Sequence, residues 1–214
     1  NPGVGDPTAI ARKTGILAAV EDSGAEWVDL TDTCICEAPE NRVARRIALP
    51  SALAQIDAVI TLPKLKTHGQ LTFTGAVKNQ FGLIPGTRKA SYHYRLQTRL
   101  WLARLIVDIN RIARPVLAVM DGIVAMEGAG PSGGRPREVG VLLAGADLSA
   151  VDAIACHLVG IDPRNVPTLT AAAEIGYGTT RLEEIEVRGG DLDALRLDDF
   201  ERISEITSLL NILP

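Results

Sequence analysis

The sequence predicts an α/β protein with a largely parallel sheet that is flanked by helices. Apolar runs of strand length alternate along the chain with longer segments whose apolar residues recur at helical spacing. The run AVITLP (58–63) lacks polar alternation, which is typical of a strand covered on both faces. Strands and helices that alternate at this spacing indicate parallel connections, with the helices packed against the sheet.

Up to residue 113, boundary residues mark two of the expected helices clearly. A helix over 8–22 ends at Ser23-Gly24, because glycine favours the backbone conformation that closes many helices. A helix over 91–113 is closed by Pro115, which cannot continue a helix. The other elements expected in this part are a strand at 27–32, a short helix at 50–56 and the strand at 58–63.

The second half of the chain continues the alternation. PVLAVMD (115–121) and VGVLLAG (139–145) have the composition of strands, and a nearly all-apolar helix over 149–160 ends at Gly160. Within it, Ser149 and Asp152 have the spacing of a capping box, so we assign Asp152 a structural role. The last elements expected are a helix at 166–176, a strand at 183–189 and an acidic, helical tail near 198–210.

Length and composition indicate one globular domain over residues 1–214, with a small inserted subdomain around 68–95. The chain has 214 residues, of which 46% are hydrophobic and 22% are charged, and a chain of this size buries roughly 70% of its unfolded surface. Its net charge of −4 argues against general binding to nucleic acids or membrane surfaces. No apolar run approaches the roughly 20 residues that span a bilayer, so we expect no membrane partner.

The three cysteines indicate a reducing compartment, and we expect a cytoplasmic location. Cys34, Cys36 and Cys156 are an odd number, which does not suggest a disulfide framework. Their spacing lacks the four ligands of an iron–sulfur cluster, so we expect no such cluster on this chain. We interpret the Cys34–Cys36 pair as small residues near a strand end rather than as metal ligands.

Lys64, Lys66 and His68 occupy alternate positions directly after the strand at 58–63. If this stretch is extended, their side chains lie on one face. Ligands of open parallel sheets bind outside the carboxyl ends of the strands, so we expect the three residues to form one wall of an anion pocket. The alternative is that the lysines only discourage pairing at an exposed sheet edge.

The charge distribution around this stretch supports an anion site. Between Leu62 and Arg114 the chain has ten basic residues and one acidic residue, Asp108. On the helix over 91–113, Arg95 and Arg99 share the inward stripe, so we expect both at the pocket end of that helix. The ten basic residues are Lys64, Lys66, Lys78, Arg88, Lys89, Arg95, Arg99, Arg104, Arg111 and Arg114.

The loop GAGPSGG (128–134) follows the strand at 115–121. Its glycines match the dinucleotide fingerprint formally, but the loop lacks the helix that must follow, so it is either a plain connector or an oxyanion-binding loop through Gly130 and Gly133. Asp121 and Glu127 frame the loop and supply oxygen ligands suited to a divalent cation such as magnesium. Acidic residues at a strand end serve equally well as turn or cap residues.

Three stretches of the sequence resemble the domain-of-unknown-function 362 family: PKLKTHGQLTFTGAVKNQFGLIPG, MDGIVAMEGAGPSGGRP and GADLSAVDAIACHLVGIDP. The resemblance covers roughly residues 2–178 and implies that the chain starts inside the family pattern, as if trimmed at its N-terminus. Some relatives carry a fused ferredoxin-like domain with iron–sulfur clusters, which implies a redox setting. The residues that correspond to the family motifs are Lys64, Lys66, His68, Lys78, Asn79, Asp121, Glu127, Gly130, Pro131, Gly133, Asp147 and Asp152.

These observations lead to two hypotheses of function. The first is an enzyme-like domain that binds a small carboxylate or phosphate compound through lysines and arginines, with Asp121 and Glu127 as further catalytic or metal-binding residues. His68 is its acid/base candidate, because imidazole titrates near neutral pH and two neighbouring lysines favour its neutral form. The second is a non-catalytic partner of an iron–sulfur or electron-transfer protein, with the basic stretch 62–114 as its docking face.

Overall fold

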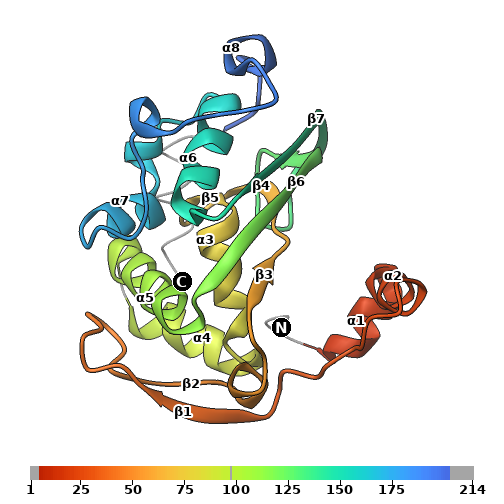
Figure 1. Ribbon diagram of the computed structural model, residues 1–214, viewed down its shortest axis with the longest axis vertical. Coiled ribbons are helices and arrows are strands. Elements are labelled where there is room, and N and C mark those ends of the chain that lie inside the picture. The colour runs from red at the N-terminus through yellow and green to blue at the C-terminus, as the bar shows by residue number, and fades with distance from the viewer. Residues whose placement is uncertain (1–4, 97, 203–214) are drawn as a thin grey trace.

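The structure is a computed structural model that describes residues 5–96 and 98–202, and it confirms the α/β class (Figure 1). Its main sheet is mixed. In this sheet β3 and β4 run parallel to β6, while β5 runs antiparallel to β4 and β7 runs antiparallel to β6. The strands are β3 (Val59–Thr61), β4 (Lys64–His68), β5 (Thr72–Thr74), β6 (Pro115–Glu127) and β7 (Arg135–Gly145).

Helices cover one side of the long strands. Figure 1 shows α3, α5, α6 and α7 on the same side of β6 and β7. The helices of this part are α3 (Ala76–Asn79), α4 (Gly86–Arg95), α5 (Arg99–Ala113), α6 (Leu148–Leu158), α7 (Pro167–Ala173) and α8 (Leu192–Leu195). Short 3₁₀ turns lie at Ser51–Ala54, Gln80–Leu83, Pro163–Asn165 and Leu182–Glu184. No helix within the described residues is long and apolar enough to cross a membrane.

The strand predicted over 115–121 is longer than predicted. β6 continues to Glu127, because β7 pairs with it along most of its length as an antiparallel partner. β3 and β4 lie one after the other along the opposite edge of β6, separated by Leu62 and Pro63. Asp121 therefore lies in the middle of a strand, opposite Lys64 on one side and Leu142 on the other.

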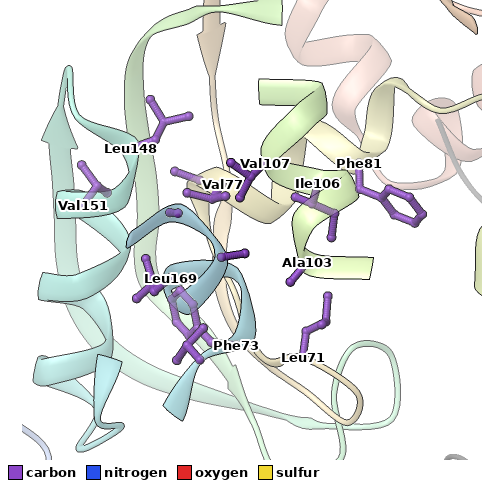
Figure 2. Close-up of a cluster of buried hydrophobic side chains, with 14 of the residues drawn as sticks. Leu71, Phe73, Val77, Phe81, Ala103, Ile106, Val107, Leu148, Val151 and Leu169 are labelled. Carbon is purple, nitrogen blue, oxygen red and sulfur yellow. The ribbon is translucent and has the colours of Figure 1, made fainter. Parts of the chain in front are cut away.

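One large hydrophobic cluster joins the helices to the sheet (Figure 2). Leu65 of β4, Phe73 of β5 and Ile106 of α5 are almost completely buried in it. Full burial of such side chains contributes roughly 1.5–3 kcal/mol each. The segment 68–95 adds Val77 and Phe81 to the same cluster, so its apolar residues pack with the rest of the chain.

Two of the predicted helices are each divided in two. The helix predicted over 8–22 forms α1 (Pro7–Lys13) and α2 (Ile16–Asp22), because Gly15 between them has a left-handed φ of 78°. The helix predicted over 91–113 is also wrong as a single element, since α4 ends at Arg95 and α5 begins at Arg99. Thr98 caps α5 by accepting a hydrogen bond from the Trp101 amide at 3.2 Å.

Two predicted strands are absent from the described part of the chain. Residues 27–32 form no strand. The first strand, β1 (Thr33–Glu37), begins directly after them and lies antiparallel to β2 (Arg46–Pro50). The region 183–189 contains the end of a 3₁₀ turn but no strand, because no neighbouring strand pairs with it. Residues 198–202 are not helical, and the rest of the predicted tail helix lies outside the described residues.

Candidate functional site

Five basic side chains gather between β4, α3 and α4, and we call them the basic cluster. Lys66 and His68 project from β4 at alternate positions, as the sequence predicts for one face of a strand. Lys78 comes from α3, and Lys89 and His93 are one turn apart on α4. Their charges lie close enough to act on one another. Lys78, His93 and Lys66 lower the pKa of His68, and Lys66 and Lys89 lower the pKa of Lys78. Lys78 also lowers the pKa of His93.

The lysines of the basic cluster lie in an unfavourable environment. Burial lowers the pKa of Lys78 from its ordinary value of 10.5 to about 7, with further lowering by the charges of Lys66 and Lys89. Burial also lowers the pKa values of Lys66 and Lys89. The side-chain amino groups of Lys66 and Lys78 form no hydrogen bond or ion pair with any residue that the structure describes. Their charges are therefore not neutralised by the protein.

His68 is held as a neutral imidazole. Its Nδ1 accepts hydrogen bonds from the backbone amides of Gln70 and Leu71, both at 3.1 Å, which assigns the ring proton to Nε2. Burial lowers the pKa of His68 to about 2, followed by repulsion from Lys78, His93 and Lys66. The neutral form was predicted, but burial is its first cause. With Nδ1 occupied, His68 is a hydrogen-bond donor through Nε2 rather than a general base.

Phe81 and Thr74, which carry no charge, lie beside the basic cluster. The His93 ring meets Phe81 edge-to-face at 5.6 Å, and partial burial followed by repulsion from Lys78 lowers the pKa of His93. Thr74 of β5 lies directly opposite Lys66, so the two side chains share a face of the sheet. The Thr74 hydroxyl is buried and has no hydrogen-bond partner among the described residues. Buried polar atoms of this kind are rare and mark a place for a ligand or water.

Buried polar contacts fix the short helix that carries Lys78. Asp152 of α6 accepts hydrogen bonds from the amides of Ala76 at 2.5 Å and Val77 at 3.0 Å, and so caps α3 from outside. Residue 75 must be glycine, because a Cβ there would lie 2.1 Å from the Asp152 carboxylate. Burial raises the pKa of Asp152 to about 7. Asp152 thus has a structural role, although Asp147 rather than Ser149 caps α6.

The predicted site residue Asn79 lies at the end of α3 and has a partner. Its side-chain amide donates to the Thr61 hydroxyl of β3 at 2.7 Å. On the other side of α3, the buried Asn110 donates to the Val77 carbonyl at 2.8 Å. These contacts hold α3 between β3 and α5, so Asn79 supports the position of Lys78.

Lys64 lies outside the basic cluster. Its Nζ is 2.5 Å from Oδ2 of Asp121, and both side chains are 45% exposed. The hydrogen bond from Lys64 holds the pKa of Asp121 below its ordinary value, with a smaller contribution from the Ile123 amide. This pair satisfies the charge of Lys64, in contrast to the charge of Lys66 two residues further along β4.

The structure does not bring Asp121 and Glu127 together as metal ligands. They are six residues apart on one extended strand, which separates them by roughly 20 Å. Glu127 is buried, and its Oε2 accepts a hydrogen bond from the Glu201 amide at 2.9 Å. Within the described residues, no three His, Cys, Asp or Glu side chains gather as candidate metal ligands.

The glycine loop packs against the end of β4. A Cβ at residue 130 would lie 2.1 Å from the Thr67 carbonyl oxygen, so this close approach requires Gly130. The Gly130 amide donates to Gly128 at 2.8 Å and the Gly133 amide to Ala129 at 3.2 Å. Because both amides donate within the loop, they are not available to an oxyanion, and the structure supports the connector alternative.

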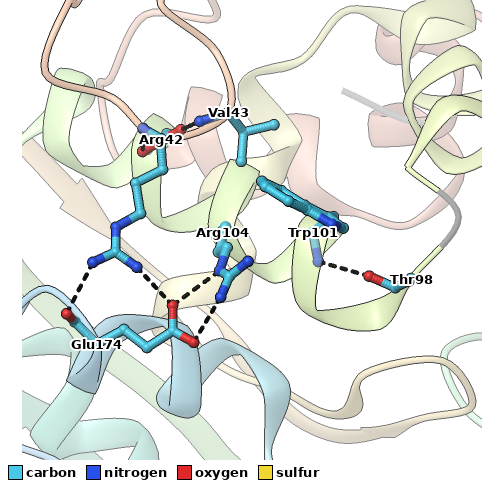
Figure 3. A network of polar contacts seen from close by, with 7 residues as sticks. Arg42, Val43, Thr98, Trp101, Arg104 and Glu174 are labelled. Atoms are coloured by element: carbon cyan, nitrogen blue, oxygen red, sulfur yellow. Dashed lines mark hydrogen bonds and ion pairs between the residues drawn. The ribbon is translucent and has the colours of Figure 1, made fainter.

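The predicted arginines are distributed over several contacts. Arg95 and Arg99 lie on either side of the break between α4 and α5 and are not among the charges that lower the pKa values of the basic cluster. Arg104 donates to Glu174 of the α7 C-cap, as does Arg42 (Figure 3). The buried Asp108 accepts hydrogen bonds from three backbone amides of residues 42–44. The basic residues of the stretch 62–114 thus differ in whether a carboxylate neutralises them.

A cavity of about 860 Å³ lies elsewhere, around α6 and α7. Three arginines line it, but each of them forms an ion pair with a nearby carboxylate. These pairs are Arg164 with Asp162, Arg181 with Glu184 and Arg196 with Asp198. We therefore place the candidate site at the basic cluster, where the amino groups of Lys66 and Lys78 lack such partners among the described residues.

The predicted residues Lys66, His68 and Lys78 belong to the basic cluster, whereas Lys89, His93 and Thr74 were not predicted as site residues. The two α4 residues have the i,i+4 spacing of one helix face, and that signal was hidden because the helix was predicted to start at residue 91. Thr74 joins the site only through its antiparallel pairing with Lys66. That pairing depends on the fold, so the linear sequence gave no signal for it.

Comparison with known proteins places these residues in a recognised family. The family described as "Domain of unknown function (DUF362)" matches residues 1–157. A thylakoid-associated protein of Synechocystis sp. is 33% identical over 184 residues, which cover 86% of this chain and 57% of that protein. This chain thus matches little more than half of the relative's length. No solved structure matches the chain. The chain belongs to the DUF362 family.

Proposed function

We propose that this protein binds a small anion, a carboxylate or phosphate compound, between β4, α3 and α4. The observation that carries this proposal is the basic cluster itself. Lys66 and Lys78 repel each other in a partly buried site and have no carboxylate partner among the described residues. A bound anion relieves this repulsion and accepts charge-assisted hydrogen bonds from the lysines. We therefore expect it to bind where the positive charge of the unliganded protein is not neutralised.

The neutral groups of the site fit the same ligand. His68 carries its proton on Nε2, because its Nδ1 already accepts hydrogen bonds from two backbone amides. The buried Thr74 hydroxyl beside Lys66 supplies another donor. Lysine ammonium groups, a neutral imidazole and a hydroxyl are all donors, which suits oxygen acceptors such as phosphate or carboxylate.

A docking face for an iron–sulfur or electron-transfer partner is the alternative function. It would require the basic residues of 62–114 to be spread over one exposed surface. Lys64 and Arg104 instead pair with Asp121 and Glu174, while the charge of Lys66 lowers the pKa of the partly buried Lys78. These different environments favour the small anion. The cytoplasmic location stays a prediction, and the relative from Synechocystis sp. is thylakoid-associated.

Isothermal titration calorimetry with inorganic phosphate, sulfate and dicarboxylates at constant ionic strength tests the proposal. We expect at least one anion to bind more tightly than chloride, and Lys66→Met to weaken it by about tenfold or more, which is about 1.4 kcal/mol. Lys64→Met is the matched control on the same strand, because Lys64 pairs with Asp121 and should not contact the ligand. If no anion binds, or if both variants lose affinity equally, the site is misassigned.

A further inference from the structure

Lys78 differs from the other lysines of the basic cluster. It projects from α3, whose position is fixed by Asp152 and Asn110, so its amino group is presented from a rigid support. It is half-buried, and no acceptor within the described part of the chain binds its amino group. Lys89, by contrast, has an interaction partner.

The surroundings of Lys78 favour the reactive form of an amine. Only the unprotonated amine attacks a carbonyl carbon, and an ordinary lysine is almost fully protonated at neutral pH. Burial and the neighbouring charges of Lys66 and Lys89 lower the pKa of Lys78 to about 7. A desolvated lysine beside another cation is a known way to activate this nucleophile.

We propose that Lys78 forms a reversible imine with a carbonyl compound that also carries a carboxylate or phosphate group. This inference rests on the proposed function, because Lys66 and the other donors of the basic cluster must hold the anionic group. The nucleophile and the anion-binding lysine lie in one cluster but on different elements, α3 and β4. A ligand can therefore be held by its anionic end while its carbonyl carbon meets Lys78.

The chemistry balances without an oxidant or reductant. The nitrogen lone pair of Lys78 forms the new bond to the carbonyl carbon, and the carbonyl oxygen becomes a hydroxyl. The amine releases two protons in total, one to that oxygen and one to the departing hydroxyl. The hydroxyl then leaves as water as the carbon–nitrogen double bond forms. Carbonyl and amine thus give one imine and one water, and addition of water reverses the reaction.

Trapping with borohydride tests this inference on the whole chain. Pyridoxal phosphate, an aldehyde with a phosphate group, is added at neutral pH, the imine is reduced, and the modified lysines are located by peptide mass spectrometry. We expect Lys78 to be modified roughly tenfold or more faster than the exposed Lys13 and Lys64, and inorganic phosphate to slow it. The variant Lys78→Arg keeps the charge and should lose the modification, while Lys64→Arg should keep it.

The outcomes separate the imine from the anion site. If phosphate binds in the calorimeter but modification spreads over the lysines according to their exposure, the imine proposal is overturned and the anion site stands. If phosphate neither binds nor slows the modification of Lys78, both proposals fail. Preferential, phosphate-sensitive modification of Lys78 in the wild type, lost in Lys78→Arg with circular dichroism unchanged, supports both.

Discussion

The cations around Glu174 and the cations of the basic cluster are arranged in opposite ways. Arg42 and Arg104 each donate to the Glu174 carboxylate at 2.9 Å, and Arg104 also lies over the Trp101 ring (Figure 3). Lys66 and Lys78 have no such partner in the described part of the chain. The contacts of Glu174 link three segments that are distant in sequence. The basic cluster instead leaves positive charge without a partner, which we propose a bound anion neutralises.

The comparison separates charges that the protein neutralises from charges that it leaves without a partner, which we propose a ligand neutralises. An exposed ion pair contributes little, typically below about 1 kcal/mol, but its sign is favourable. A partly buried cation without a partner is unfavourable until something neutralises it. Substitutions in the two regions should therefore change stability in opposite directions, while loss of the support beneath the basic cluster should have a larger effect than either.

The largest effect should come from Asp152→Ala, which removes the support of α3. Two buried amides, those of Ala76 and Val77, would lose their acceptor, and we expect a loss of about 3 kcal/mol in the free energy of unfolding. Urea denaturation measures this, with Asp162→Ala as a control that removes a partly exposed carboxylate paired with Arg164. A loss in Asp152→Ala no larger than in the control would show that α3 does not depend on this cap.

Lys78→Met should act in the opposite direction. It replaces a partly buried, unneutralised cation by an apolar side chain of similar length, and we expect an increase of about 1 kcal/mol in the free energy of unfolding without added anion. The comparison with Lys64→Met, which breaks the pair with Asp121, provides the matched control. Destabilisation by Lys78→Met would indicate that the protein itself neutralises this charge.

The advantage of Lys78→Met should shrink as the pH rises. The folded pKa of Lys78, about 7, lies below its ordinary value of 10.5, so between these values the unfolded chain binds more protons at Lys78. The stability of the wild type therefore rises with pH across this window, relative to a variant that cannot titrate there. Urea denaturation of both proteins between pH 6 and about pH 9 checks this, and parallel profiles would contradict the lowered pKa.

Glu174→Gln should have the smallest effect. It weakens the contacts to Arg42 and Arg104, which lie partly in solvent, and we expect a loss of about 0.5–1 kcal/mol that decreases at high salt. Anion binding should be unchanged, because neither arginine acts on the basic cluster. Thermal denaturation at low and high salt measures the effect, and a salt-independent loss would indicate that packing of Arg104 on Trp101 dominates.

The parts predicted correctly depend on local patterns. Alternation predicted the extended stretch that carries Lys66 and His68 in β4. The assignment of Lys78 and Asn79 as site residues came from the resemblance to the family and stays a prediction. The α/β class followed from the apolar runs and the helices between them. These signals lie within a few residues of each other in the sequence, so they do not depend on long-range pairing.

The parts predicted wrongly depend on distant partners. Asp121 was predicted to end a strand, but pairing with β7 continues β6 through that point. The hydrogen bond by which Asp152 caps α3 joins residues 76 positions apart. Lys64 lies outside the basic cluster because the residue opposite it on β6 is an aspartate, with which it pairs. Such long-range contacts decide which of several equivalent charges remains unpaired, and the linear sequence does not record them.

The dependence of stability on phosphate concentration, compared between the wild type and a variant without two lysines of the basic cluster, tests the anion site most directly. The free energy of unfolding is measured for the wild type and for the double variant Lys66→Met, Lys78→Met as inorganic phosphate is raised at constant ionic strength. Without phosphate the double variant should be the more stable. With phosphate at about 100 times its dissociation constant, the wild type should gain about 2.7 kcal/mol and become the more stable protein. Curves that stay parallel would contradict an anion site in the basic cluster.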